Sequence, residues 1–312
     1  MAWKVLLTDG LEENGKEILR SKAQMTDQPG ISADDLLKVA GEYDAIIVRG
    51  RTKITPAVFD VAPNLKVVGR AGVGVDNIDL SAAMSHNVIV VNSPTATTLA
   101  VAELAIGLMF AISREIPKAD CGMKNNKWLK KELEGVELNG KTLGVVGFGR
   151  IGRATAQRAA ALGMKIIAYD PKQSAEEISA NGAEPVPLES LYAQSDFITV
   201  HTPLTNETRG VINASSFAMM KDGVRLIDAA RGGVVDEAAL LEALNSGKVA
   251  AAGLDVFATE PPGENELTCH PRVVATPHIG AQTAEAQARA AEDIATEVLA
   301  ALNGEYLRWR VA

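Results

Sequence analysis

Short apolar runs alternate with amphipathic, helix-like stretches along almost the whole chain. The apolar runs predict buried β-strands, and they cover residues 3–8, 45–48, 66–68, 88–91, 142–146, 165–169, 197–200 and 226–228. Hydrophobic strands separated by helices are typical of parallel sheets that are covered by helices on both faces. The pattern therefore predicts an α/β fold built from doubly wound parallel sheets.

Two breaks in this pattern predict two domains. Near residues 92–95 the strands give way to a long apolar helix, and after Gly280 the chain enters an Ala-rich amphipathic segment. If that last segment packs on the first predicted strands, one domain is inserted in the other, and ligands bind in the cleft between them. The predicted domains are residues 1–95 with 283–312, and residues 96–282.

The long apolar helix, predicted over about residues 98–113, has apolar side chains around most of its circumference and Glu103 as its one internal charge. A helix of this kind must be buried on nearly every side. Two explanations are open: the helix lies inside the protein, or one face is buried against a second subunit. A homodimer or larger homo-oligomer is therefore one of the expected states.

A glycine-rich turn follows the predicted strand 142–146. Gly147, Gly149 and Gly152 have the G-x-G-x-x-G spacing, in which glycine permits a tight turn, close approach of a pyrophosphate and close helix packing. Asp170 ends the next predicted strand, near the position of the carboxylate that binds an adenosine ribose. The alternative is an ordinary strand–helix turn. The pattern predicts dinucleotide binding, and Asp170 favours NAD over NADP because a carboxylate repels a ribose phosphate.

Composition narrows the classes of partner. The 312 residues suffice for two domains with substantial cores, and the formal net charge of −8 gives no overall attraction to nucleic acid or anionic membranes. Cys121 and Cys269 are too few for a disulfide framework, which favours a reducing compartment. The longest uncharged apolar stretch, residues 104–112, is too short to cross a bilayer. We expect a soluble, cytoplasmic protein.

Three residues in the second half of the chain suit the interconversion of a 2-hydroxy acid and a 2-keto acid. Histidine titrates near neutral pH, so His278 can be the base in one direction and the acid in the other. Glu260, if it hydrogen-bonds the ring, would favour the protonated form and hold one tautomer. Arg231 can hold carboxylate and keto oxygens in a planar fork. Taken singly, an ion-paired arginine, a loop glutamate and a capping histidine are ordinary features.

Six motifs occur in order along the chain: residues 70–79, 147–152, 196–204, 230–236, 253–262 and 277–280. Together they resemble those of the D-2-hydroxyacid dehydrogenases, over essentially the whole chain. The resemblance implies a Rossmann-type cofactor domain inserted in a flavodoxin-like substrate domain, and it gives Arg231, Glu260 and His278 the catalytic roles described above. Residues 48–53, 127–131 and 137–144 are most similar to the branch that oxidises 3-phospho-D-glycerate with NAD, at the entry to serine biosynthesis.

The resemblance also implies a set of cofactor contacts. It puts Arg150 and Ile151 at the pyrophosphate, Asp170 at the adenosine ribose and Asp255 near the nicotinamide carboxamide. The full implied set is Val73, Gly147, Gly149, Arg150, Ile151, Gly152, Asp170, Thr202, Pro203, Ala229, Ala230, Arg231, Asp255, His278, Ile279, Gly280 and Ala281.

Substrate contacts are expected in the first domain. The turn at residues 72–75 can present successive N–H groups to a carboxylate, and by resemblance Val73 and Gly74 contact the substrate. A basic cluster in an acidic protein suits a phosphate group, although a solvated basic face is the alternative. The cluster consists of Arg49, Arg51, Lys53 and Arg70, and Lys130 could add a phosphate contact across a dimer.

Some positions depart from the family pattern or lie outside it. Asp228 stands where asparagine is usual, so an extra carboxylate close to Arg231 could partly neutralise it, and Thr97 also replaces a common asparagine. No histidine pairs with cysteines or carboxylates at zinc-ligand spacing, so we expect no metal; His201 either faces the cofactor or is a core residue. No regulatory extension follows Ala312 in this sequence, so feedback control by serine is not inferred.

Two alternatives to the phosphoglycerate reaction stay open. The same residues could reduce glyoxylate, hydroxypyruvate or another 2-keto acid that carries no phosphate. The chain could also be an NAD-sensing binding protein, similar to the transcriptional corepressors built on this fold, since the fold alone does not determine a function.

Overall fold

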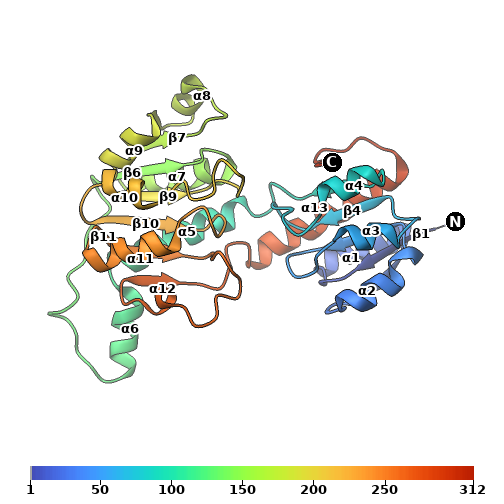
Figure 1. Ribbon diagram of the computed structural model, residues 1–312, viewed down its shortest axis with the longest axis horizontal. Coiled ribbons are helices and arrows are strands. Elements are labelled where there is room, and N and C mark those ends of the chain that lie inside the picture. The colour runs from blue at the N-terminus through green and yellow to red at the C-terminus, as the bar shows by residue number, and fades with distance from the viewer. Residues whose placement is uncertain (1) are drawn as a thin grey trace. The chain divides into compact units, whose positions relative to one another are not determined.

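The computed structural model describes residues 2–312, which form two compact units. Unit 1 contains the residues up to Thr97 together with Ala281–Ala312, and unit 2 contains Thr98–Gly280. The domain boundaries predicted from the sequence lie within two residues of these limits. Figure 1 traces both units from the N-terminus to the C-terminus.

Unit 1 is a five-stranded sheet in the order β2-β1-β3-β4-β5, with every pair parallel. Its strands are β1 (Trp3–Leu7), β2 (Ala23–Asp27), β3 (Ala45–Val48), β4 (Val67–Arg70) and β5 (Ile89–Asn92). Its helices are α1 (Glu13–Lys22), α2 (Ala33–Val39), η1 (Ala40–Glu42), α3 (Pro56–Asp60), α4 (Leu80–Ser85) and α13 (Ala284–Asn303).

Helix α13 joins the C-terminal segment to the start of the chain. It is amphipathic and buries Ile294 and Val298 in a core shared with β1, β3 and β4. The backbone of α13 approaches α1 so closely that a Cβ at Gly15 would lie 2.6 Å from the Ala291 carbonyl oxygen. The second core of unit 1, on the opposite sheet face, includes Leu36 of α2 and Phe59 of α3. The sheet of unit 1 is therefore covered on both faces.

Unit 2 is a seven-stranded parallel sheet in the order β12-β11-β10-β9-β6-β7-β8. Its strands are β6 (Thr142–Val146), β7 (Lys165–Tyr169), β8 (Glu184–Pro185), β9 (Phe197–Val200), β10 (Val224–Asp228), β11 (Val249–Leu254) and β12 (Val273–Ala275). Its helices are α5 (Thr98–Ser113), α6 (Ile116–Lys124), α7 (Arg150–Ala161), α8 (Ala175–Ala180), α9 (Leu188–Gln194), α10 (Ala214–Met219), α11 (Glu237–Ser246) and α12 (Glu266–Cys269).

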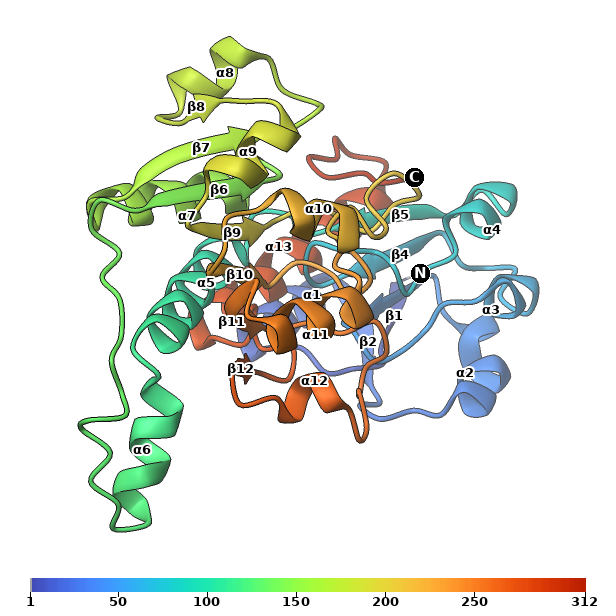
Figure 2. The ribbon, with the colours of Figure 1, turned by 60° about the vertical axis from the view of Figure 1, so that its left-hand side comes forward.

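The strand order of unit 2 reverses between β6 and β9. The strand that opens the sheet, β6, therefore lies centrally, and the carboxyl ends of β6 and β9 border the point where ligands bind in doubly wound folds. Helices α5, α7 and α8 contribute to the core on one face, and α9, α10, α11 and α12 contribute to the core on the other. Figure 2 shows these two helical layers. The prediction of doubly wound parallel sheets is confirmed in both units.

The helix predicted over residues 98–113 forms as α5, and within one chain only part of its apolar surface is buried. One side packs in the core of unit 2 through residues such as Leu108 and Met109, whereas Leu99 is 48% exposed and Phe110 is 37% exposed. The apolar side chains of α5 thus lie in two environments: some are buried in the core of unit 2, and others are exposed at the surface. Within residues 2–312, no helix has the length and apolar character needed to cross a membrane.

Candidate functional site

The glycine-rich turn lies between β6 and α7, at the reversal point of the sheet. Gly147 has φ +90°, and a Cβ there would lie 2.8 Å from the carbonyl carbon of His201. A Cβ at Gly152 would collide with the carbonyl oxygen of Gly147. Gly149 caps α7 and has open space where its Cβ would stand. Two glycines are thus required by packing, and the third leaves room for a ligand at the helix N-terminus.

Asp170 braces this turn from the end of β7. Its Oδ2 accepts a hydrogen bond from the Phe148 N–H at 2.8 Å, and its Oδ1 accepts one from the Lys172 N–H at 2.9 Å. Gln173 also donates to Phe148 O, at 2.6 Å. The carboxylate therefore lies beside the turn, where a ribose would follow a pyrophosphate.

Two polar atoms beside the turn have no hydrogen-bond partner among the described residues. They are His201 Nδ1 and Thr202 Oγ1, both buried, at the end of β9. Burial lowers the pKa of His201 to about 4, so the imidazole is neutral at neutral pH. Its Nε2 contacts Thr199 Oγ1 at 3.0 Å. Buried polar atoms normally find partners, so these two fit a polar ligand seated on the turn.

These features fit a bound dinucleotide. The backbone at residues 149–151 would hold the pyrophosphate at the positive end of α7, Asp170 would hold the adenosine ribose, and His201 and Thr202 would supply the unused polar atoms. Sequence analysis gave His201 two interpretations, and its unpartnered Nδ1 favours the ligand-facing one.

His278 and Glu260 form a close histidine–carboxylate pair in unit 2. His278 Nδ1 lies 2.7 Å from Glu260 Oε2, and Glu260 Oε1 accepts a hydrogen bond from the Phe257 N–H at 3.1 Å. Burial alone would raise the pKa of Glu260, but hydrogen bonds from His278 and Phe257 and the charges of His278 and Arg231 hold it below its ordinary value. Glu260 is therefore an anion that orients the ring and leaves Nε2 to exchange a proton.

The backbone at His278 is held in an uncommon conformation. Its φ is +53°, in the left-handed region that non-glycine residues rarely adopt. Its N–H donates to Thr276 O at 3.0 Å. Asp255, fully buried at the end of β11, accepts hydrogen bonds from Thr276 Oγ1 at 2.6 Å and from the N–H groups of Ile279 and Gly280 at 2.8 Å. Hydrogen bonds to Asp255 thus hold the backbone both before and after His278.

This role of Asp255 was missed in the sequence, where the resemblance implied a contact with the nicotinamide carboxamide. The three donors that bind its carboxylate come from within unit 2. A signal was present, because an acid at the end of a strand faces the loop that follows the neighbouring strand. No comparable sequence feature indicated that Thr276 also donates a hydrogen bond to Asp255.

Arg231 lies close to the histidine–glutamate pair. It is half-buried after β10, and its Nη1 donates to Ala230 O at 2.6 Å. Its charge lowers the pKa of Glu260 and also favours the anion of Asp228, which shows that all three side chains share one electrostatic environment. Unit 2 therefore brings together the three residues predicted to carry the chemistry.

Asp228, which departs from the family pattern, lies in a well-defined buried environment. The side chain is buried, and Ala230 N–H donates to its Oδ1 at 2.9 Å. Burial raises the pKa of Asp228 to about 7, and the repulsion of Asp255 and Glu237 adds to that rise while the Ala230 hydrogen bond and Arg231 oppose it. The expected neutralisation of Arg231 by this carboxylate is therefore weakened, because a protonated carboxyl has no charge.

In unit 1 the predicted basic cluster is tied to one aspartate that sequence analysis did not single out. Asp9, whose side chain is 4% exposed, accepts hydrogen bonds from the Arg49 N–H at 2.8 Å and the Thr52 N–H at 3.1 Å, and it pairs with Arg51 at 3.2 Å. Arg51 also donates to Thr8 O at 2.9 Å and Ile31 O at 3.1 Å. Most of its donors are thus used inside unit 1.

The remaining predicted substrate residues belong to unit 1, except Lys130. The Arg49 guanidinium donates to Gln282 Oε1 at 3.2 Å, Lys53 is exposed, and Arg70 lies against Gly72, whose φ of +140° permits the contact. Val73 O accepts a hydrogen bond from the Asn92 side chain at 2.6 Å, which fixes the turn at residues 72–75. Lys130 is exposed in unit 2, in the loop after α6. Thr97 is buried at the end of the first segment of unit 1.

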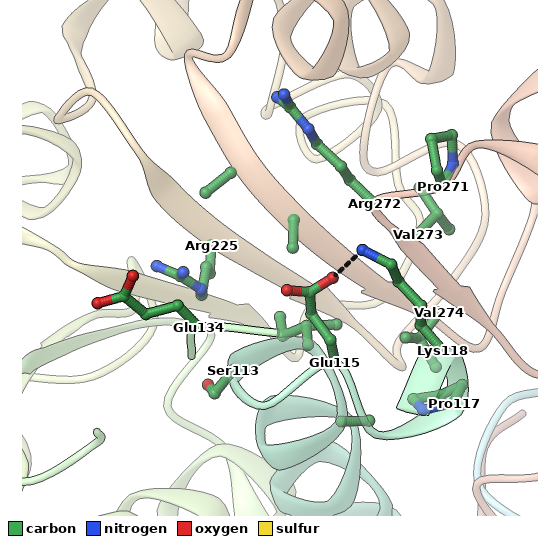
Figure 3. Close-up of a pocket in the computed structure, with 14 residues that line it drawn as sticks. Ser113, Glu115, Pro117, Lys118, Glu134, Arg225, Pro271, Arg272, Val273 and Val274 are labelled. Atoms are coloured by element: carbon green, nitrogen blue, oxygen red, sulfur yellow. Dashed lines mark hydrogen bonds and ion pairs between the residues drawn. The ribbon is translucent and has the colours of Figure 1, made fainter. Parts of the chain in front are cut away.

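A separate cavity of about 170 Å³ lies at the opposite edge of the unit 2 sheet. Figure 3 shows Arg225 of β10 and Val274 of β12 among the residues that line it, together with Glu115 and Lys118, which form an ion pair at 2.9 Å. None of the predicted catalytic or cofactor residues lines it. The candidate site is therefore the carboxyl edge of the sheet and not this hollow. Across residues 2–312, no three histidine, cysteine or acidic side chains gather as a metal site would require.

Comparison with known families agrees with this geometry. Residues 106–280 match the model of the D-isomer specific 2-hydroxyacid dehydrogenase, NAD binding domain. The chain belongs to the D-isomer specific 2-hydroxyacid dehydrogenase family. The resemblance seen in the sequence motifs is thus confirmed, and unit 2 contains the NAD-binding domain of that family.

Proteins similar to this chain are named for different substrates. The chain is 46% identical to a D-3-phosphoglycerate dehydrogenase from Rattus norvegicus, over 97% of this chain and 57% of that protein. A glyoxylate reductase structure from Paecilomyes thermophila is 33% identical, with a TM-score of 0.91, 99% of this chain covered and 98% of the other. A D-lactate dehydrogenase from Aquifex aeolicus, complexed with NAD and lactic acid, is 30% identical, with a TM-score of 0.85 and 96% of each chain covered.

The chain thus spans little more than half the length of the curated relative that it matches. It covers nearly the whole of the two solved structures.

Proposed function

We propose that this chain catalyses the NAD-dependent oxidation of 3-phospho-D-glycerate to 3-phosphohydroxypyruvate, the entry step of serine biosynthesis. The observation that carries the proposal is the His278–Glu260 pair, which shares the environment of Arg231 in the family's NAD-binding unit. The substrate is suggested by the 46% identity to a D-3-phosphoglycerate dehydrogenase.

Each residue has one task in the proposed reaction. His278 Nε2 removes the proton of the C2 hydroxyl, and the Glu260 carboxylate stabilises the imidazolium that results. When bound, NAD⁺ accepts the hydride that leaves C2. Arg231 holds the substrate carboxylate and the oxygen that becomes the carbonyl. The proton on His278 passes to solvent, so the products are the keto acid, NADH and one proton, and the reverse direction uses the same groups.

We propose that unit 2 binds the cofactor through the contacts inferred from the family resemblance, and that unit 1 binds the substrate. The turn at residues 72–75 would receive the carboxylate, and Arg49, Lys53 and Arg70 would receive the phosphate. Arg51 is a weaker candidate than sequence analysis suggested, because its guanidinium already binds Asp9 and two carbonyl groups. Asp170 would select NAD over NADP by repelling a ribose phosphate.

A second candidate is the reduction of an unphosphorylated 2-keto acid. This candidate is favoured by the ion pair between Arg51 and Asp9, because it makes Arg51 less available to bind a phosphate group. The similarity to a glyoxylate reductase and a D-lactate dehydrogenase supports the same alternative. Both candidates use the same three catalytic residues and differ only in what unit 1 recognises.

The test is NADH consumption with 3-phosphohydroxypyruvate and hydroxypyruvate, which differ only by the phosphate, and with glyoxylate and pyruvate in parallel. A kcat/KM at least tenfold higher for the phosphorylated acid, worth about 1.4 kcal/mol in the transition state, supports the proposal. Equal or better use of hydroxypyruvate or glyoxylate overturns the substrate and favours the second candidate. No turnover of any acid, with NADH still bound, would point to an NAD-sensing binding protein.

We also propose a cytoplasmic homodimer. Helices α5 and α6 and the loop that follows carry exposed apolar residues, namely Leu99, Phe110, Ile116, Met123 and Trp128. Figure 2 shows α6 and that loop extending away from the sheet of unit 2. A second copy of the chain would cover this surface. Cys121 and Cys269 are both free thiols, which suits a reducing compartment. Light scattering that shows only monomer at micromolar concentration would contradict the dimer.

A further inference from the structure

One buried carboxyl group of the candidate site has no part in the reaction as described. Asp228 is the last residue of β10, and it lies in register with Val200 of β9 and Leu254 of β11. It is 2% exposed. Its own carbonyl accepts a hydrogen bond from the Asp255 N–H at 2.8 Å, and its Oδ1 accepts one from the Ala230 N–H at 2.9 Å. The Asp228 side chain therefore holds, through Ala230, the backbone that leads from β10 to Arg231.

The charges that act on Asp228 come from Asp255, Glu237 and Arg231. Asp255 of β11 and Glu237 of α11 repel a second negative charge, and Arg231 attracts one. On the β9 side, the titratable neighbour is His201, which burial keeps neutral near pH 7. On α5, the charged residue is Glu103, which pairs with Arg158 at 3.3 Å.

Asp255 has more hydrogen-bond donors around its carboxylate than Asp228, and Glu237 is less buried than Asp228. Asp255 accepts three hydrogen bonds, and Glu237 Oε1 accepts one from the Ala258 N–H at 2.6 Å. Glu260, which also shares the field of Arg231, is paired with His278. One guanidinium therefore serves several acidic groups, and a further buried anion at Asp228 is unfavourable.

We propose that Asp228 is a positioning residue that works in its protonated form, and that its ionisation draws Arg231 away from the substrate carboxylate. The inference rests on the proposed role of Arg231. A neutral carboxyl at this place supports the backbone at Ala230 and adds no further negative charge to those that already act on Arg231. An ionised carboxyl competes with that anion for the same guanidinium.

The direction of the effect can be worked out. Burial raises the pKa of Asp228 to about 7, so the group is neutral below that pH and becomes charged above it. Substrate binding should therefore weaken as the pH rises through neutrality. In the direction of oxidation, His278 acts as a base in the chemical step, which determines kcat, whereas Asp228 acts on substrate binding. The two groups thus act on different kinetic constants.

The experiment compares the wild-type chain with Asp228→Asn, measuring kcat and KM for the hydroxy acid across neutral pH. We expect the wild-type KM to rise by up to about tenfold per pH unit on the alkaline side, as for one ionisation, and the KM of Asp228→Asn to stay flat there. Asp222→Asn is the matched control, because Asp222 is an exposed aspartate of unit 2 that pairs with Lys248. Identical KM profiles in the wild type and Asp228→Asn would overturn the inference.

A second measurement does not depend on turnover. Infrared difference spectra between mildly acidic and alkaline pH should contain the carbonyl band of a protonated carboxyl that titrates near neutrality, and Asp228→Asn should lack it. Absence of that band from the wild type would also overturn the inference.

The outcome is separable from that of the proposed function. If the wild type prefers an unphosphorylated acid, the proposed substrate is wrong, and the KM comparison is made with the preferred acid, because every 2-hydroxy acid has the carboxylate that Arg231 would hold. If no acid is turned over, the infrared comparison still decides the state of Asp228.

Discussion

His278 Nδ1 and Glu260 Oε2 lie 2.7 Å apart, although 17 residues and the whole of β12 separate the two positions in the chain. The contact engages one ring nitrogen with a carboxylate whose pKa is held below its ordinary value, chiefly by His278 against the opposing effect of burial. A histidine oriented in this way can give up or receive a proton only through Nε2.

Replacing His278 removes the proton acceptor without removing the fold. We expect His278→Ala to lower kcat by about 10²–10⁴-fold, the usual contribution of a general acid/base, with little change in the affinity for NADH. His270→Ala is the matched control, since that histidine lies before β12 and its Nδ1 accepts only a backbone contact from Arg272 N–H at 3.2 Å. Steady-state kinetics in both directions measure the effect, and near-normal turnover of His278→Ala would exclude the assigned role.

The arginines of unit 1 should separate phosphate recognition from structural support. Arg49→Ala is expected to raise the KM for the phosphorylated acid at least several-fold and to leave the melting temperature nearly unchanged. Arg51→Ala leaves the buried Asp9 without its ion pair, so it should lower the free energy of unfolding, by about 1–3 kcal/mol. Kinetics together with thermal unfolding measure both. An unchanged KM in Arg49→Ala would argue against a phosphate site there.

Cofactor choice should depend on Asp170. Its removal leaves the Phe148 N–H without an acceptor and takes away the charge that opposes a ribose phosphate. Asp170→Ser should therefore raise the Kd for NADH and narrow the preference for NADH over NADPH, which fluorescence titration of both cofactors measures. Glu176→Gln, on the exposed start of α8, is the control for loss of one negative charge. Equal preference ratios in wild type and Asp170→Ser would contradict the selection by charge.

His201 should make the protein sensitive to acid. Its folded pKa is about 4, against an ordinary value of 6.5, so the unfolded chain binds more protons between these two pH values. The free energy of unfolding should fall as the pH drops through this window, by up to roughly 3 kcal/mol. His201→Gln, which remains neutral, should lose that part of the pH dependence. Urea unfolding at a series of pH values is the measurement, and parallel curves for the two proteins would disprove it.

The sequence predicted those features that follow from periodicity and from glycine geometry. Strands β1, β3, β4, β5, β6, β7, β9 and β10 appear as apolar runs because both faces of each sheet are covered. Gly147 and Gly152 are recognisable because no other residue fits their contacts. Four strands, β2, β8, β11 and β12, were not predicted. Strands β8 and β12 have only two or three residues and therefore show no periodicity. Strand β2 is an edge strand with polar residues, and β11 consists largely of alanine and glycine.

The parts of the site that escaped prediction are those set by long-range contacts. Nothing local in the sequence indicates that Asp9 binds both Arg51 and the Arg49 backbone, or that Asp255 clamps residues 276–280. Asp228 was noticed as a departure, but its protonation depends on burial and on the charges of Asp255 and Glu237. These contacts and charges cannot be predicted from the sequence, because they arise only when the fold brings the ends of different strands together.

The left-handed backbone at His278 has a consequence for how the protein can change by mutation. A non-glycine residue in this conformation costs roughly 1–2 kcal/mol, so glycine would be the more stable choice at this position, and β-branched residues would be the least tolerated. Selection for thermal stability alone would therefore favour glycine at this position, whereas the proposed acid/base role requires the imidazole. In variant libraries, glycine should score above histidine for folding and below it for activity.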